Sequence, residues 1–97
     1  MKAWYYSAAA YQRTRQPQKA IECYQKVISD WPDSKLVPSV QFMIGQCLER
    51  MIEEKLIAPS EAKASIKAIY QQILDNYPNS PDAEYSRLWI KDYDSKN

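Results

Sequence analysis

The sequence predicts an all-α protein in which helical hairpins stack side by side into a solenoid. The segment at residues 24–34 (YQKVISDWPDS) recurs at residues 70–80 as YQQILDNYPNS. A repeat at this interval is typical of folds built from stacked helical units. The 97 residues include one glycine and no histidine, and helix-forming residues dominate. Apolar residues also recur at helical spacing in five segments, which are described in chain order below.

The first two expected helices, at residues 2–14 and 17–30, form a hairpin. One face of the first helix carries apolar residues at i, i+4 and i+7: Trp4, Ala8 and Tyr11. Pro17 suits the first position of the second helix, where a backbone N–H is not needed. The apolar stripe of the second helix consists of Ala20, Tyr24, Val27 and Trp31. Pro32 ends this helix, because the residue before a proline avoids the α region.

The third expected helix, at residues 35–55, is apolar over a wide arc. Asp33 and Ser34 offer an N-cap for it. One stripe consists of Leu36, Val40, Met43, Cys47 and Met51, and a second stripe consists of Val37, Ile44, Leu48 and Ile52. A helix with so wide an apolar arc is expected to have neighbours on two sides.

The last two expected helices lie at residues 59–76 and 81–92. The apolar residues of the fourth helix are Ala62, Ile66, Ile69, Tyr70, Ile73 and Tyr77, and Pro78 ends it. Ser80, Pro81 and Asp82 give the fifth helix a strong start, with a capping serine, a proline and an early acid. Residues 93–97 are expected to fray. All connections are short, so consecutive helices should pack antiparallel.

Length and composition exclude several classes of function. The chain has the size of a single domain, residues 1–97. Thirteen basic and twelve acidic residues give a net charge of +1, which does not favour general nucleic-acid binding. No apolar stretch is long enough to span a membrane, and the first residues do not form a signal peptide.

No enzyme activity, metal or cofactor is expected. Without histidine the usual nucleophile–base pairs are missing, and Gly45 alone cannot build a phosphate-binding loop. Glu49, Glu53 and Glu54 could bind a cation as a carboxylate cluster, but a solvated acidic face is the favoured interpretation. Two cysteines, Cys23 and Cys47, lack metal-ligand spacing. They are expected to fill the core, with a disulfide between them as the alternative.

Residues 2–33 resemble the tetratricopeptide repeat, whose signature combines tryptophan, a leucine–glycine pair, tyrosine, alanine, phenylalanine and proline. The matching positions are Trp4, Ser7-Ala8, Tyr11, Ala20, Tyr24 and Pro32. Ser7 in place of leucine is the main departure and indicates a less tightly packed N-terminal edge. A second, more divergent unit matches at Ile44-Gly45, Leu48, Ile66, Tyr70, Ile73 and Pro78.

The resemblance implies a right-handed α-solenoid of two tetratricopeptide-like hairpins and a C-terminal capping helix. The first repeat would cover about 2–33, the second about 34–79 with a lengthened hairpin, and the capping helix about 81–92. The aromatic-Pro-Asp/Asn-Ser endings are similar to those of bacterial envelope proteins of this family, including outer-membrane-assembly and Tol–Pal-associated members. This similarity implies a bacterial origin and a periplasmic site, with the cytoplasm as the alternative.

The resemblance also implies a non-enzymatic role in protein–protein interaction, as an adaptor or assembly factor for a larger complex. In this family the first helix of each repeat lines a concave binding face. By position, the partner-binding residues would be Tyr5, Gln12, Arg13, Phe42, Gln46, Glu49, Arg50, Tyr85 and Leu88. Phe42 lies off the main stripe of its helix, so it is expected to be free for a partner.

Two other interpretations remain. The adjacent apolar residues Leu88, Trp89 and Ile90 would leave an exposed patch, through which the chain could form homo-oligomers. A basic group near the first hairpin would instead bind RNA or another anion, with strong salt dependence. Its members are Lys2, Arg13, Arg15 and Lys19.

Overall fold

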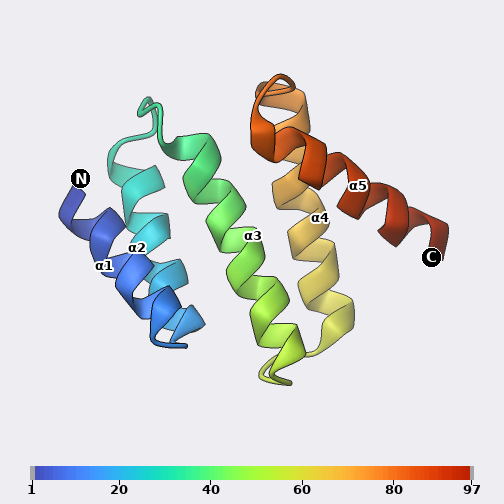
Figure 1. Cartoon of the computed structure of the whole chain (residues 1–97), viewed down its shortest axis with the longest axis horizontal. Helices are drawn as coiled ribbons and strands as arrows, with labels where there is room; N and C mark the ends of the chain where they lie inside the picture. The colour runs from blue at the N-terminus through green and yellow to red at the C-terminus, as the bar shows by residue number, and fades with distance from the viewer. Residues whose placement is uncertain (1, 97) are drawn as a thin grey trace.

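The computed structural model describes residues 2–96 as a row of five α-helices. These are α1 (Lys2–Arg13), α2 (Pro17–Asp30), α3 (Val37–Glu53), α4 (Pro59–Asn76) and α5 (Pro81–Lys96). The first four lie side by side in chain order, and α5 crosses α4 at an angle (Figure 1). No strand occurs in the described part of the chain. The predicted all-α helical-repeat solenoid is therefore confirmed.

The ends of two helices differ from the prediction. Ser34 does not cap α3: its Oγ accepts the N–H of Leu36 at 3.1 Å in a preceding turn, and α3 begins at Val37. After Glu53, Lys55 adopts a left-handed backbone conformation with φ 60°. No helix in the described residues is long and apolar enough to span a membrane.

The C-terminal segment is helical, so the expected fraying is wrong for residues 93–96, while Asn97 lies outside the described residues. Lys67 Nζ forms an ion pair with Asp94 Oδ1 at 2.7 Å and lies over the ring of Tyr93. Lys96 pairs with Asp92 one turn away. These contacts hold the last turns of α5, and the first pair ties them to α4.

Two apolar clusters form the core. The first joins the α1–α2 hairpin to α3 and includes both cysteines, Cys23 and Cys47. The predicted role of these residues as core filling is confirmed: both are buried and neither forms a disulfide. Burial raises the pKa of the Cys47 thiol to about 11, which keeps it protonated and unreactive at neutral pH. The second cluster joins α3, α4 and α5.

Each cluster contains a buried tyrosine from the second helix of a hairpin. Tyr24 is 1% exposed and shares its cluster with Ala8, while Tyr70 is fully buried against Gly45. A Cβ added to Gly45 would overlap Tyr70 Cε1 and would lie 2.9 Å from Cζ. The small residues of the first helices therefore provide the space that the tyrosine rings occupy.

Phe42 belongs to the core, so the expectation that it is free for a partner is wrong. Its side chain is 9% exposed and stacks on Tyr70, with ring centroids 5.7 Å apart. Tyr85 of α5 packs edge-on against the Phe42 ring, with ring centroids 5.2 Å apart. The packing of α5 across the second hairpin buries this position.

Two tryptophans expected on apolar stripes are only partly buried. Trp4 is 43% exposed because α1 packs chiefly on α2 alone. Trp31 is 36% exposed because it follows the last residue of α2 with a non-helical backbone (φ −134°, ψ 61°), which takes it off the helix face.

At both ends of the row of helices, polar or small residues occupy positions that pack on a neighbouring helix inside the row. Ser7 of α1 is exposed at the position that the buried Ile44 occupies in α3. In α5, exposed Lys91 and Asp94 take the positions of Gly45 and Leu48. These substitutions suit helix faces in contact with water, as expected for the terminal units of a helical repeat.

We predict that Gly45→Ala destabilises the fold, because the added methyl group overpacks the contact with Tyr70. Overpacking costs about 1–3 kcal/mol, partly offset by the higher helix propensity of alanine, about 1 kcal/mol. The measurement is chemical denaturation of Gly45→Ala in the wild-type and in a Tyr70→Leu background. With the ring removed, Gly45→Ala should become neutral or stabilising. An equal loss in both backgrounds would contradict this packing.

We predict that Ser86→Ala stabilises the protein. Ser86 is fully buried in α5, and its hydroxyl lacks a hydrogen-bond partner within the described residues. An unpaired buried polar group costs about 1–3 kcal/mol. The exposed Ser65→Ala in α4 is the matched control, since it changes helix propensity without changing burial. If thermal melts show no greater gain for Ser86→Ala than for Ser65→Ala, the hydroxyl carries no such penalty.

Candidate functional site

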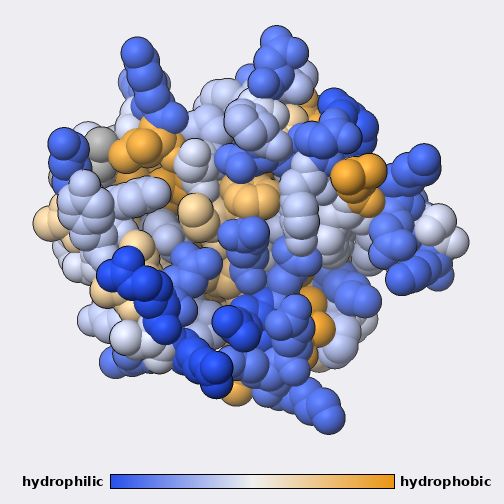
Figure 2. Space-filling model, viewed as in Figure 1, coloured by the Kyte–Doolittle hydropathy of each residue, from blue (hydrophilic) through white to orange (hydrophobic). Residues whose placement is uncertain are grey.

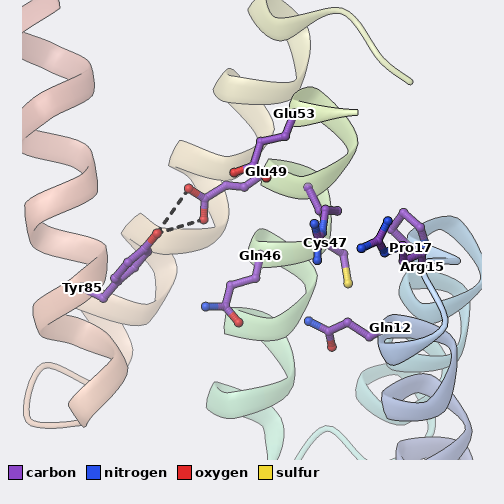
Figure 3. Close-up of a pocket in the computed structure, with 9 residues that line it drawn as sticks. Gln12, Arg15, Pro17, Gln46, Cys47, Glu49, Glu53 and Tyr85 are labelled. Atoms are coloured by element: carbon purple, nitrogen blue, oxygen red, sulfur yellow. Dashed lines mark hydrogen bonds between the residues drawn. The ribbon is translucent and has the colours of Figure 1, made fainter. Parts of the chain in front are cut away.

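The first helices of the units, α1, α3 and α5, form one face of the row, where α1 and α5 lie in front of α2 and α4 (Figure 1). Neighbouring pockets form a groove along this face. Its central pocket, of ≈ 280 Å³, lies between the α1–α2 turn, α3 and α5 (Figure 3). The residues that line this pocket are Gln12, Arg15, Pro17, Gln46, Cys47, Glu49, Arg50, Glu53 and Tyr85.

Two further pockets continue the groove in opposite directions. The pocket at the α1 end, ≈ 310 Å³, shares Gln12 with the central one and is lined by Tyr5, Ala9, Gln12, Arg13, Tyr24 and Met43. The pocket at the α5 end, ≈ 160 Å³, shares Glu49 and Glu53 and is lined by Glu49, Ile52, Glu53, Lys63, Ile66 and Trp89. We call the three pockets together the groove.

The structure brings most of the residues predicted to bind a partner into this groove: Tyr5, Gln12, Arg13, Gln46, Glu49, Arg50 and Tyr85. Phe42 lies in the core, and Leu88, although 58% exposed, lines none of the three pockets.

The prediction missed several groove residues, of which Arg15, Glu53 and Lys63 carry charge. Arg15 and Glu53 belonged to the basic and acidic groups noted in the sequence, but the partner-binding residues were taken from first-helix positions and did not include them. Lys63 lies on α4, the second helix of its hairpin, so first-helix positions could not identify it. Arg15 lies beyond the end of α1, where a left-handed backbone (φ 61°) turns the chain into α2. Helical spacing predicts which side chains share a face of a helix, but it does not predict where a side chain on such a turn lies.

A tyrosine hydroxyl from each hairpin reaches the groove floor and donates a hydrogen bond there. Tyr24 donates to Gln12 Oε1 at 2.9 Å, and Tyr70 donates to Glu49 Oε2 at 2.7 Å. Gln12 and Glu49 each lie four residues after the small residue of their helix, Ala8 or Gly45. The same cross-hairpin bond therefore occurs in both units.

Glu49 also connects α3 to α5. Tyr85 donates to its two carboxylate oxygens, each at 3.3 Å, and Figure 3 shows the phenol pointing at the carboxylate. Glu49 thus receives hydrogen bonds from two tyrosines on two different helices. This arrangement fixes the carboxylate at the centre of the groove.

Burial moves the pKa of these three phenols further above neutral pH. Burial raises the pKa of Tyr24 to about 12. Burial, followed by the hydrogen bond to Glu49 and its charge, raises the pKa of Tyr70 far above its ordinary value. Burial and the Glu49 charge raise the pKa of Tyr85 as well. All three phenols are therefore neutral donors at physiological pH.

The arginines of the groove have no ion-pair partner among the described residues. The ion pairs found there are Lys26–Asp30, Lys67–Asp94, Arg87–Glu84 and Lys96–Asp92, all outside the groove lining. Arg13, Arg15 and Arg50 are exposed, and so is Glu53. Strongly hydrophilic residues gather over the lower middle of this face, where α1 and α3 end (Figure 2). These charges are available to a ligand.

The apolar run near the end of the chain does not form one exposed patch. Ile90 is 8% exposed and belongs to the core, so its expected role as an oligomer contact is wrong. Trp89 is half-buried and stacks on Tyr93, with ring centroids 5.3 Å apart. Leu88 is the exposed member of the three. Neighbouring exposed Lys91 and Asp92 make this side of α5 largely polar.

The side chains that line the groove include amides, guanidinium groups, carboxylates and phenols, which can form hydrogen bonds and ion pairs with a ligand. The chain has no histidine, and residues 2–96 contain no group of three or more cysteine, aspartate or glutamate residues arranged to hold a metal ion. The donors and acceptors that line the groove suit the polar and charged groups of another protein.

Comparison with known proteins identifies the repeat. Residues 2–34 and 39–80, more than half of the chain, match the profile of the Tetratricopeptide repeat family. No curated protein and no solved structure matches the chain significantly. Repeats of this family generally mediate protein–protein interaction. With its matching profile and its stacked helical hairpins, the chain belongs to the tetratricopeptide repeat family.

Proposed function

We propose that this protein is a non-enzymatic adaptor or assembly factor that holds a peptide or subunit of a larger complex in the groove. The observation that carries this proposal is a continuous groove across α1, α3 and α5 lined by charged side chains without ion-pair partners. Arginine and tyrosine are also the residues that most often dominate the binding energy of protein interfaces. The groove offers both, at Arg13, Arg50, Tyr5 and Tyr85.

The other interpretations receive less support. Homo-oligomerisation through α5 would require an apolar face, but Ile90 is buried and Lys91 and Asp92 are exposed. Nucleic-acid binding would require a consistently basic surface, but Glu49 and Glu53 lie in the same pocket as the arginines. A protein ligand of mixed charge fits this lining better.

A role in the bacterial envelope is a finer proposal. It is supported by the two aromatic-Pro-Asp/Asn-Ser endings, at 31–34 and 77–80. Fractionation of a bacterium that carries the gene, with detection of the endogenous protein, separates a periplasmic from a cytoplasmic site. Recovery in the cytoplasmic fraction would remove the envelope proposal and leave the adaptor proposal standing.

We predict that the groove variant Arg13→Ala/Gln46→Ala/Arg50→Ala loses its protein partner. Affinity capture from a lysate of that bacterium, followed by mass spectrometry, compares this variant with the wild type. Loss of three groove side chains should lower capture about tenfold or more, since interface anchors each contribute 1 kcal/mol or more. Phe42 is left unchanged, because its removal would disturb the core.

The matched control is Gln25→Ala/Lys26→Ala/Lys35→Ala, which also removes one glutamine and two cations. These residues are exposed and line none of the groove pockets. The control should capture the partner like the wild type, and circular dichroism should show all three proteins folded. Equal loss in both variants, or undiminished capture by the groove variant, would contradict binding in the groove.

A further inference from the structure

The charges that line the groove change sign from one end to the other. The pocket at the α1 end contains Arg13 as its charged residue, a net +1. In the central pocket Arg15 and Arg50 balance Glu49 and Glu53. In the pocket at the α5 end Glu49 and Glu53 outweigh Lys63, a net −1. The lining is therefore basic at the α1 end and acidic at the α5 end, where Glu49 and Glu53, which also line the central pocket, outweigh Lys63.

We propose that the groove selects a charge-polarised peptide segment, with an acidic residue toward α1 and a basic residue toward α5. This inference rests on the proposed function and specifies its partner class. Complementary charges fix the register of a bound segment, while charges of equal sign brought together disfavour the wrong partner. The reversed order would place an acid beside Glu53 and a base beside Arg13.

The α5 end suits the shape of a basic side chain as well as its charge. Ile52, Ile66 and Trp89 line this pocket together with the glutamates. A lysine or arginine can lay its aliphatic stem along such an apolar surface while its charged end stays near a carboxylate. Glu53 is exposed, and its carboxylate has no ion pair within residues 2–96, so it can meet that charge.

The α1 end suits an acidic side chain. Arg13 lies beside Gln12, whose side-chain oxygen accepts the hydrogen bond of Tyr24. The amide nitrogen of Gln12 can then donate to a ligand. Arg15 and Arg50, which line the adjoining central pocket, add two guanidinium groups that pair well with carboxylates.

The groove is ordered before a ligand arrives. Glu49 is held by Tyr70 and Tyr85, and Trp89 is fixed by its stacking on Tyr93 and its edge contact with Tyr70. A ligand therefore meets one carboxylate and one aromatic ring that are already fixed, which reduces the entropic cost of ordering them on binding.

The test starts from a random-peptide display library as the probe. Peptides are selected on the wild-type protein, with counter-selection on Arg13→Ala/Gln46→Ala/Arg50→Ala to remove those that bind elsewhere. Enriched peptides are synthesised in two forms, one as selected and one with acidic and basic residues exchanged. Fluorescence anisotropy then measures the affinity of each form.

The selected form should bind about tenfold tighter than the exchanged form, because two favourable exposed pairs become two unfavourable ones. This preference should weaken as salt is added. The protein variant Arg13→Glu/Glu53→Lys, with reversed charges at the two ends, should prefer the exchanged form. The control Glu22→Lys/Lys35→Glu reverses two exposed charges outside the groove and should keep the wild-type preference.

The outcomes separate this inference from the proposed function. If groove-dependent peptides bind equally well after their charges are exchanged, the charge order is overturned and peptide binding in the groove stands. If selection on the wild type yields no peptide that depends on the groove, both the charge-order inference and the proposed function are contradicted. Inverted preference in the charge-reversed variant, without inversion in the control, establishes the inference.

Discussion

The structure depends on the fit of a tyrosine ring over a small residue in each helical hairpin. Tyr70 occupies the space that a side chain on Gly45 would fill, and Tyr24 shares its buried cluster with Ala8. A tyrosine combines a large apolar body with a polar tip that needs a partner when buried. Here the ring joins the two helices and the hydroxyl bonds to the first helix one turn further along. The distance between the helices and their register are thus set by the same side chain.

This fit also determines what the groove presents. The hydroxyl of Tyr70 reaches Glu49, and Glu49 in turn accepts from Tyr85, so that the second hairpin and α5 are joined at the groove floor. Phe42 is buried as a consequence, because Tyr85 and Tyr70 enclose its ring. The arginines stay outside this network and remain available. Rigid packing beneath the groove and unpaired arginines on its surface together suit the recognition of a partner.

Much of this arrangement could be predicted from the sequence. The repeated segment and the prolines identified the helices, and seven of the nine partner-binding residues predicted from first-helix positions line the groove. The exceptions depend on tertiary contacts. Burial of Phe42 and Ile90 requires knowledge of where α5 crosses, and exposure of Trp4 depends on the packing of α1 chiefly on α2. The position of Arg15 could not be predicted, because a residue in a left-handed turn does not lie on a face of a helix.

Tyrosine ionisation, followed by ultraviolet absorbance alongside helical circular dichroism, tests the central claim most directly. Burial raises the pKa of Tyr24 from 10.0 to about 12, and that of Tyr70 also rises. Their contribution to stability is therefore complete below pH 10 and is lost as pH rises through the folded-state pKa. Tyr24 and Tyr70 should ionise late and together with loss of helix. Tyr24→Phe and Tyr70→Phe should each remove part of the late signal. Ionisation of all eight tyrosines near pH 10 in a protein that stays helical would contradict the account.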